Sequence, residues 1–185
     1  MNRVVITGIG IISCLGNDKK EVLTSLLESK SGLTLNSEYK ENGMRCHISG
    51  QVNPNLDSID RKMLRFMSET SAYAFLCTEE ALADAGLSIE AINNDKTGVI
   101  VGSGTGSSRE LKNVIDTARE KGIKRIGPYA VTRTMGNTTS AAISTFFQTK
   151  GVSFSIASAC STSLHCISYA FDLIKSGRQQ TVIAG

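Results

Sequence analysis

The sequence lacks the patterns that mark several classes of protein. Its five cysteines are odd in number and widely spaced, with no Cys-x-x-Cys pair and no signal peptide before them. We therefore expect neither a disulfide framework nor a metal site, and a reducing, cytoplasmic compartment. No apolar stretch reaches the roughly 18 residues needed to span a bilayer, so we expect a soluble protein with no membrane partner.

Strong charge is also absent. The net charge is only +3, and no run of Lys or Arg is interleaved with aromatic residues, so nucleic acid is not an expected partner. With 41% hydrophobic and 20% charged residues, the composition is typical of an ordinary globular protein. We expect one domain that spans residues 1–185.

Apolar runs alternate with helical patterns along the chain. Buried strands are expected at 3–8, 97–102, just before Cys160, and at 180–185. Helices are expected at 18–29, at 60–85 with a break near Ser68, and at 107–120, 131–147 and 162–176. Residues 31–57 are expected to form loops with a short strand near 45–52. This alternation predicts an α/β fold with a mostly parallel or mixed sheet and helices on both faces.

The last expected strand, at 180–185, leads directly to the final residue. A buried strand rarely serves as a chain terminus unless it is pinned, and it normally continues into a further element. We therefore expect the domain to be truncated at its C-terminal end.

Cys160 stands where a β-rich run gives way to a helical pattern. A thiol at the first turn of a helix faces unpaired N–H groups and the positive end of the dipole, which lower its pKa below about 8.5. The small neighbours Ser158, Ala159 and Ser161 would let a substrate carbonyl reach those N–H groups. The alternative is a buried cysteine that only packs, as we expect for Cys166 inside the helix.

A cysteine nucleophile usually works with a histidine, and the sequence contains only two. His165 follows Cys160 by five residues, about 140° around a helix, so we expect it to point elsewhere as a hydrogen-bonded core residue. His47 lies in the glycine-containing loop region and is expected to be structural or exposed. The acid–base partner of Cys160 is therefore missing.

Two glycine-rich segments suggest nucleotide binding only weakly. Gly8-Ile-Gly10 half-matches the dinucleotide fingerprint, but Ser13 replaces the third glycine and Glu28 falls inside a helix. A tight turn explains it, so a nicotinamide-dependent reductase is a weak alternative. The segment 102–106 lacks the Lys-Ser/Thr ending of a phosphate-binding loop and predicts a close-packed turn that lines a pocket.

Two groups of basic residues lie near expected helix ends: Arg61, Lys62 and Arg65, and Lys121, Lys124 and Arg125. Most such charges form a solvated face. Cations at a helix start oppose its dipole, however, and this placement favours a negatively charged partner.

A series of segments runs through the chain in a fixed order: Val5-Ile-Thr-Gly-Ile-Gly-Ile-Ile-Ser13, Ser31-Gly-Leu-Thr34, Gly43-Met-Arg45, Ile59-Asp-Arg-Lys-Met-Leu-Arg-Phe-Met67, Ala83-Asp-Ala-Gly-Leu-Ser88, Gly102-Ser-Gly104, Gly127-Pro-Tyr-Ala-Val-Thr132 and Ser158-Ala-Cys-Ser-Thr-Ser163. Together they resemble the N-terminal half of the β-ketoacyl-acyl carrier protein synthases, above all the type I bacterial condensing enzymes of fatty-acid synthesis. Agreement in order over the whole chain is more specific than any single motif.

The resemblance implies a thiolase-like fold, in which this chain is one αβα half of a five-layer αβαβα molecule that forms a homodimer. It implies that Cys160 accepts an acyl chain from a carrier-protein thioester, for decarboxylative condensation with malonyl-carrier protein. Two histidines and a lysine of the second half assist that step and have no counterpart here. The 185 residues alone are therefore expected to be inactive in condensation.

The same resemblance assigns further residues. Arg61, Lys62 and Arg65, with Lys121 and Lys124 supplied by the other subunit, would meet the acidic acyl carrier protein. Thr105 and Met135 would line the acyl pocket, and the Cys160 amide would be one oxyanion donor. Substrates would arrive on the phosphopantetheine arm of the carrier protein, so no cofactor is expected. Thr105 replaces a glycine of similar sequences, so the preferred acyl length does not carry over. The alternative is a non-catalytic carrier-protein-docking fragment or remnant.

Overall fold

Three short parallel strands form the central sheet of the structure, a computed structural model that describes residues 2–185. Strand β3 (Thr97–Ile100) lies in the middle, between β4 (Ser153–Phe154) and β5 (Thr181–Ala184). Val99 is the partner of Ser153 on one side and of Ile183 on the other. The expected α/β class with a parallel sheet is confirmed.

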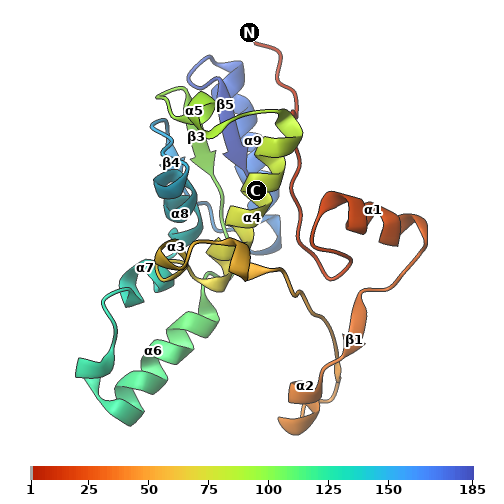
Figure 1. Cartoon of the computed structure of the whole chain (residues 1–185), viewed down its shortest axis with the longest axis vertical. Helices are drawn as coiled ribbons and strands as arrows, with labels where there is room; N and C mark the ends of the chain where they lie inside the picture. Colours follow the sequence, from red (N-terminus) through yellow and green to blue (C-terminus); the bar gives the residue numbers. More distant parts are fainter. Residues whose placement is uncertain (1) are drawn as a thin grey trace.

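Helices and short turns make up most of the remaining regular structure (Figure 1). In chain order, with the strands β1 and β2 of a small hairpin, they are α1 (Lys19–Leu27), β1 (Leu33–Leu35), α2 (Ser37–Glu41), β2 (Ile48–Gly50), η1 (Leu56–Ser58), α3 (Arg61–Leu64), α4 (Glu69–Ala85), α5 (Ile89–Ile92), α6 (Ser108–Lys121), η2 (Ile123–Arg125), α7 (Ala130–Thr134), α8 (Thr138–Phe146), η3 (Ala159–Ser161) and α9 (Thr162–Lys175). None of the helices in residues 2–185 combines the length and apolar character that crossing a bilayer requires.

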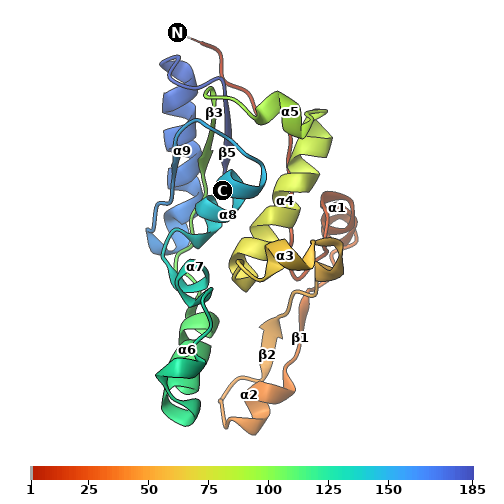
Figure 2. The same ribbon diagram turned by 60° about the vertical axis from the view of Figure 1, so that its left-hand side comes forward.

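Helices cover both faces of the sheet, with α9 on one side and α4 and α8 on the other (Figure 2). Successive side chains of a strand point to opposite faces. Val99 accordingly packs in the same cluster as Phe75 and Ile143 of α4 and α8, whereas Ile100 packs with Leu173 of α9. All four residues of β3 are buried, which explains why this strand carries no charged residue in the sequence.

The long helical stretch at 60–85 breaks where the sequence predicts. Ser68 caps α4 and forms a reciprocal capping box with Ser71, and Gly86 ends the helix in the left-handed region at φ 65°. The prediction of a single helix at 131–147 is wrong, because the chain forms two helices, α7 and α8, with a break between them. Met135 adopts an extended ψ of 146° at the end of α7, which stops the helix.

A hairpin of β1 and β2 replaces most of the loop expected at 31–57, and it projects away from the sheet (Figure 1). The strands pair antiparallel, with Leu33 opposite Gly50, and Asn36 caps the short helix α2 between them. The short strand expected near 45–52 is confirmed as β2. Strand β1 alternates Leu33-Thr34-Leu35, but it is only three residues long and Leu35 is 81% exposed. Hydrophobic patterning is too short here to predict a strand.

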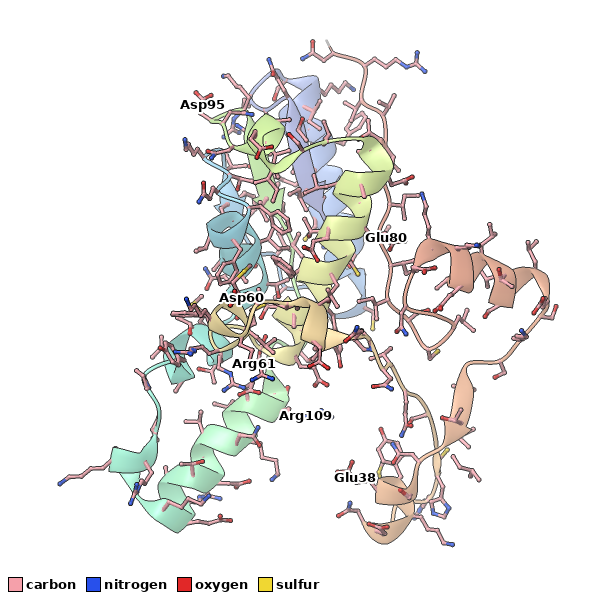
Figure 3. The ribbon with its side chains drawn as sticks, in the orientation of Figure 1. Glu38, Asp60, Arg61, Glu80, Asp95 and Arg109 are labelled. Atoms are coloured by element: carbon pink, nitrogen blue, oxygen red, sulfur yellow. The ribbon has the colours of Figure 1, made fainter. Side chains whose placement is uncertain are left out.

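The prediction of a strand at 3–8 is wrong. Residues 2–12 form no strand, and Val5 and Ile6 are 56% and 78% exposed. This segment is bonded to α4 instead: the Ile9 N–H donates to Asp84 and the Ile11 N–H donates to Glu80. Figure 3 labels Glu80 on α4, beside the N-terminal segment. An apolar run forms a doubly buried strand only when other elements cover it on both faces, whereas this segment packs against α4 and leaves Val5 and Ile6 exposed.

Gly8 and Gly10 serve this contact with α4 and do not form the tight turn expected for them. A Cβ on Gly8 would stand 2.0 Å from the Ala81 carbonyl oxygen, and one on Gly10 would stand 1.8 Å from that of Cys77. Both glycines therefore allow an extended segment to approach a helix backbone. This packing explains the half-matched fingerprint without a nucleotide.

Candidate active site

Cys160 lies in the middle of η3, the turn that links the segment after β4 to the start of α9. This position confirms the strand-to-helix junction expected from the sequence. The side chain is exposed, so the alternative of a buried cysteine that only packs is wrong. Ala159, the residue before it, has φ 51°, a left-handed conformation that is strained for any residue with a Cβ. The thiol is thus presented on a strained surface turn.

Thr162 holds this turn from beneath. Its hydroxyl accepts a hydrogen bond from the Ser158 N–H at 2.9 Å and donates one to the Ala159 carbonyl oxygen at 2.7 Å. The side chain is buried, at 4% exposure, so the two bonds are shielded from water. Sequence reasoning missed this residue, although a threonine that opens a helix is a common partner for nearby backbone groups.

The loop after β3 packs against the same turn. A Cβ on Gly102 would lie 2.1 Å from the Ile156 carbonyl oxygen, and one on Gly104 would lie 2.7 Å from that of Ala159. Backbone meets backbone at both places, so only glycine fits. The close packing predicted for the turn at 102–106 is confirmed at Gly102 and Gly104, and the pocket that this turn is expected to line stays a prediction.

His165 is hydrogen-bonded, as expected, but it does not lie in the core. It is exposed and not a core residue, and its Nδ1 lies 2.6 Å from the Ser158 hydroxyl oxygen, in hydrogen-bond contact. The helical angle of about 140° places it away from Cys160 only if both residues belong to one continuous helix. Here the helix begins at Thr162, and the turn folds Ser158 back toward His165.

The start of α9 supplies the electrostatics of the site. Ser161 occupies the N-cap but makes no side-chain hydrogen bond to the first-turn amides. The helix begins at Thr162, two residues after Cys160, and the positive end of a helix dipole favours negative charge nearby. An oxyanion that forms beside the turn would be stabilised by it.

The other cysteines have different surroundings. Cys166 is fully buried in α9, as expected, and burial raises the pKa of its thiol. Burial, followed by the nearby Glu80 carboxylate, also raises the pKa of the Cys77 thiol. Both groups are therefore held as neutral thiols, which are poor nucleophiles.

The two residues expected in an acyl pocket come from different loops. Thr105 is exposed in the loop between β3 and α6, next to Gly104 and hence beside the Cys160 turn. Met135 ends α7 and is half-buried, and its carbonyl oxygen accepts the Thr138 N–H at the start of α8. Thr105 thus follows a glycine that packs against the Cys160 turn, and Met135 belongs to a separate segment.

The basic residues expected to meet a carrier protein are all exposed and fall into two groups. Arg61, Lys62 and Arg65 belong to α3 or its C-cap, where the Asp60 carboxylate accepts the Lys62 N–H. Lys121 ends α6 and Lys124 lies in η2, at the end of α6 far from α3 (Figure 1). The structure does not bring the two groups together within one chain.

His47 precedes β2 in the projecting hairpin and is half-buried, in line with the structural or exposed position expected for it. Its carbonyl oxygen accepts the Asn36 N–H at 2.7 Å. Among residues 2–185, no group of three His, Cys, Asp or Glu side chains is arranged to hold a metal ion.

Comparison with known sequences gives one consistent result. The family model described as "Beta-ketoacyl synthase, N-terminal domain" matches residues 1–185. The chain is 48% identical over 188 residues to 3-oxoacyl-[acyl-carrier-protein] synthase 1 of Haemophilus influenzae, and 50% identical over 190 residues to that of Escherichia coli K12. Each match covers 100% of this chain but 46% of the relative, so the chain spans about half the length of these relatives.

Solved structures agree on the fold. A β-ketoacyl synthase from Burkholderia phymatum matches 97% of this chain and 45% of its own, with a TM-score of 0.83 and 28% identity. A ketosynthase solved in complex with a type II PKS acyl-carrier protein matches with a TM-score of 0.75 at 20% identity, which supports the fold alone. The expected ketosynthase-type half is therefore confirmed.

Proposed function

Because the chain belongs to the β-ketoacyl synthase family through its N-terminal domain, we propose that it is the nucleophile-bearing half of a condensing enzyme of fatty-acid synthesis. The proposal rests on one observation above all: Cys160 is exposed on a strained turn at an uncapped helix start. The names of the similar proteins, 3-oxoacyl-[acyl-carrier-protein] synthase 1, support the substrate class.

The first chemical step follows from this geometry. The Cys160 sulfur, once its proton has passed to solvent, attacks the carbonyl carbon of an acyl thioester on the carrier protein. The carbonyl oxygen becomes an oxyanion near the first-turn amides of α9, including that of Cys160. When the carbonyl re-forms, the phosphopantetheine thiolate of the carrier protein leaves, and the acyl chain remains on Cys160 as a new thioester.

The second step needs groups that this chain does not offer. Decarboxylation of malonyl-carrier protein gives a carbanion that attacks the acyl-Cys160 carbonyl and releases the sulfur. Of the two histidines, His165 is bonded to Ser158 and His47 lies in the projecting hairpin. We therefore assign the acyl-accepting step to this chain and the decarboxylating groups to the second half of a complete enzyme, which acts as a homodimer.

The remaining residues take supporting roles in the proposal. Thr105, beside the turn, and Met135 contact the acyl chain. The exposed cations Arg61, Lys62 and Arg65 of one subunit, with Lys121 and Lys124 of the other, attract the acidic carrier protein. Their position in two separate groups supports recognition by two subunits.

Acyl transfer from a purified acyl-carrier protein thioester tests the function. Intact-mass analysis should find one acyl group on the chain, peptide mapping should place it on Cys160, and Cys160→Ser should abolish it. Sustained formation of β-ketoacyl product by this chain with malonyl-carrier protein would contradict the assignment of the decarboxylating groups to a second half. No acylation of the folded chain would contradict the nucleophile assignment.

A second candidate is a carrier-protein-docking fragment or remnant without chemistry. The exposed apolar side chains of Val5, Ile6 and Leu35 favour it to the extent that exposed apolar surface marks contact with another protein. Binding of the carrier protein that is weakened by Arg61→Glu, without acylation of Cys160, would support this alternative.

A further inference from the structure

One polar contact at the candidate site has no part in the chemistry described so far. The Ser158 hydroxyl oxygen and the His165 Nδ1 are 2.6 Å apart. Ser158 precedes the thiol by two residues, and His165 follows it by five, so this bond spans the turn that carries Cys160. It also joins that turn to α9, a helix of 14 residues.

The turn needs such restraints. Ala159 has φ 51°, and a left-handed conformation at a residue with a Cβ persists only where the surroundings hold it. Thr162 and Gly104 hold the turn on its inner side, where Thr162 is 4% exposed. The bond between Ser158 and His165 is the restraint on the exposed side.

We propose that His165 is a positioning residue that fixes the Cys160 turn through Ser158. The inference rests on the proposed function, because it assumes that Cys160 is the nucleophile. His165 is part of a rigid helix, so its Nδ1 defines where the Ser158 hydroxyl must lie. The Ser158 backbone, which also donates to Thr162, then sets the path of Ala159 and the direction of the thiol.

His165 acts through Ser158 and not directly on the sulfur. Its Nδ1 is engaged by the hydroxyl, so that nitrogen does not take the thiol proton. Loss of the bond should therefore change how often the thiol is presented correctly. Ser158→Ala breaks the bond and keeps the imidazole, so it separates this effect from the loss of a proton acceptor. An asparagine at residue 165 can place an amide atom near the Nδ1 position, so it should preserve the restraint.

The rate of Cys160 alkylation by iodoacetamide in the full 185-residue chain measures this presentation without condensation. The variants are Ser158→Ala, His165→Ala, the double variant and His165→Asn, with Ser168→Ala as a control on an exposed serine of the same helix. Each alanine variant should slow alkylation roughly fivefold, the effect of one hydrogen bond of about 1 kcal/mol. The double variant should be no slower than either single one, and His165→Asn should recover most of the rate.

Cys46, which is exposed in the projecting hairpin, serves as the internal reference rate, and thermal unfolding shows that each variant is folded. Unchanged Cys160 rates in His165→Ala, additive losses in the double variant, or no recovery with asparagine would each overturn the positioning role. The acylation assay on the parent chain reports separately on the proposed function. A parent that is acylated while His165→Ala alkylates normally would refute only this inference.

Discussion

Gly104 lies against Ala159 so closely that a Cβ at position 104 would stand 2.7 Å from the Ala159 carbonyl oxygen. The loop after β3 and the turn after β4 are therefore in backbone contact where the parallel strands end. Side chains that follow such strands gather at one edge of the sheet, which is where α/β proteins place their sites. The contact explains why a glycine-rich segment accompanies a cysteine more than fifty positions later in the sequence.

Gly104→Ala should disturb both stability and thiol presentation. The added methyl group must displace backbone, so we expect the free energy of unfolding to fall by about 1–3 kcal/mol, a typical effect of overpacking. Alkylation of Cys160 should slow in the same variant. Gly127→Ala is the matched control, because no atom lies within 4 Å of a Cβ there and no positive φ is recorded. Equal urea midpoints for the two variants would contradict the close approach.

Short-range sequence patterns predict much of the fold and part of the candidate site. The caps at Ser68 and Gly86, the buried strand β3 and the junction at Cys160 all depend on residues near one another in the sequence, so they could be predicted. The failure at 3–8 has a different cause, because burial of an apolar run depends on distant elements. The sequence of this segment shows that it is apolar, but it does not show which other elements cover it.

The prediction of a core position for His165 is wrong for a geometric reason. It assumes one ideal helix through Cys160 and His165, whereas η3 is a 3₁₀ turn that begins with a left-handed residue. A reversal of this kind has no signature in an Ala-Cys-Ser sequence. Thr162 was missed for the same reason, since its two backbone partners become neighbours only after the turn forms.

Cysteine labelling should follow exposure and ionisation in the folded chain. At pH 7, a time course with iodoacetamide and peptide mapping should modify Cys160 and Cys46 first, because both are exposed. Cys77 and Cys166 should react last, since burial raises the pKa of each thiol and limits access. In concentrated urea the difference should disappear. Equal rates for all cysteines without urea would mean that the chain is not folded as described.

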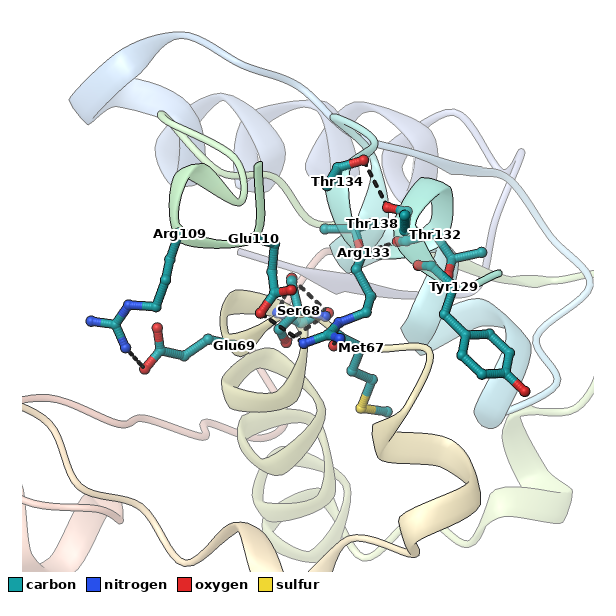
Figure 4. A network of polar contacts seen from close by, with 12 residues as sticks. Met67, Ser68, Glu69, Arg109, Glu110, Tyr129, Thr132, Arg133, Thr134 and Thr138 are labelled. Atoms are coloured by element: carbon teal, nitrogen blue, oxygen red, sulfur yellow. Dashed lines mark hydrogen bonds and ion pairs between the residues drawn. The ribbon is translucent and has the colours of Figure 1, made fainter. Parts of the chain in front are cut away.

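The Glu110–Arg133 ion pair should be important for joining α6 to α7. The carboxylate lies 2.8 Å from the guanidinium and is 12% exposed, and Arg133 also donates to the Met67 carbonyl oxygen (Figure 4). Glu110→Gln leaves a half-buried guanidinium without its counter-charge. We expect a loss of about 1–2 kcal/mol in unfolding free energy, less than the roughly 3–5 kcal/mol of a fully buried pair.

Asp116→Asn is the matched control for Glu110→Gln on the same helix. Asp116 pairs with Lys112 four residues earlier, and the lysine side chain is 75% exposed. Such pairs contribute about 0.3–0.5 kcal/mol, so this variant should unfold almost like the parent. If thermal unfolding showed equal losses for both variants, the Glu110–Arg133 pair would not hold the two helices together.

Asp84 should make stability depend on pH in the acid range. Its carboxylate binds the Lys19 ammonium and accepts the Ile9 N–H at 3.0 Å, and these two bonds, that of Lys19 first, hold its pKa below the usual value. A lowered folded-state pKa means that the stabilising contribution is present above the unfolded-state pKa of about 3.9. It is lost as the pH falls through the folded-state pKa.

Urea unfolding of the parent and of Asp84→Asn between pH 7 and pH 3 tests this linkage. The asparagine can still accept the Ile9 N–H, so the variant removes the charge and little else. It should be less stable than the parent at pH 7. The difference should shrink below about pH 4, where the carboxylate of the unfolded parent begins to take up a proton while that of the folded parent is still charged. A difference that stays constant down to pH 3 would mean that the charge does not help to hold the N-terminal segment on α4. In that case, the backbone contacts at Gly8 and Gly10 would have to account for the position of this segment.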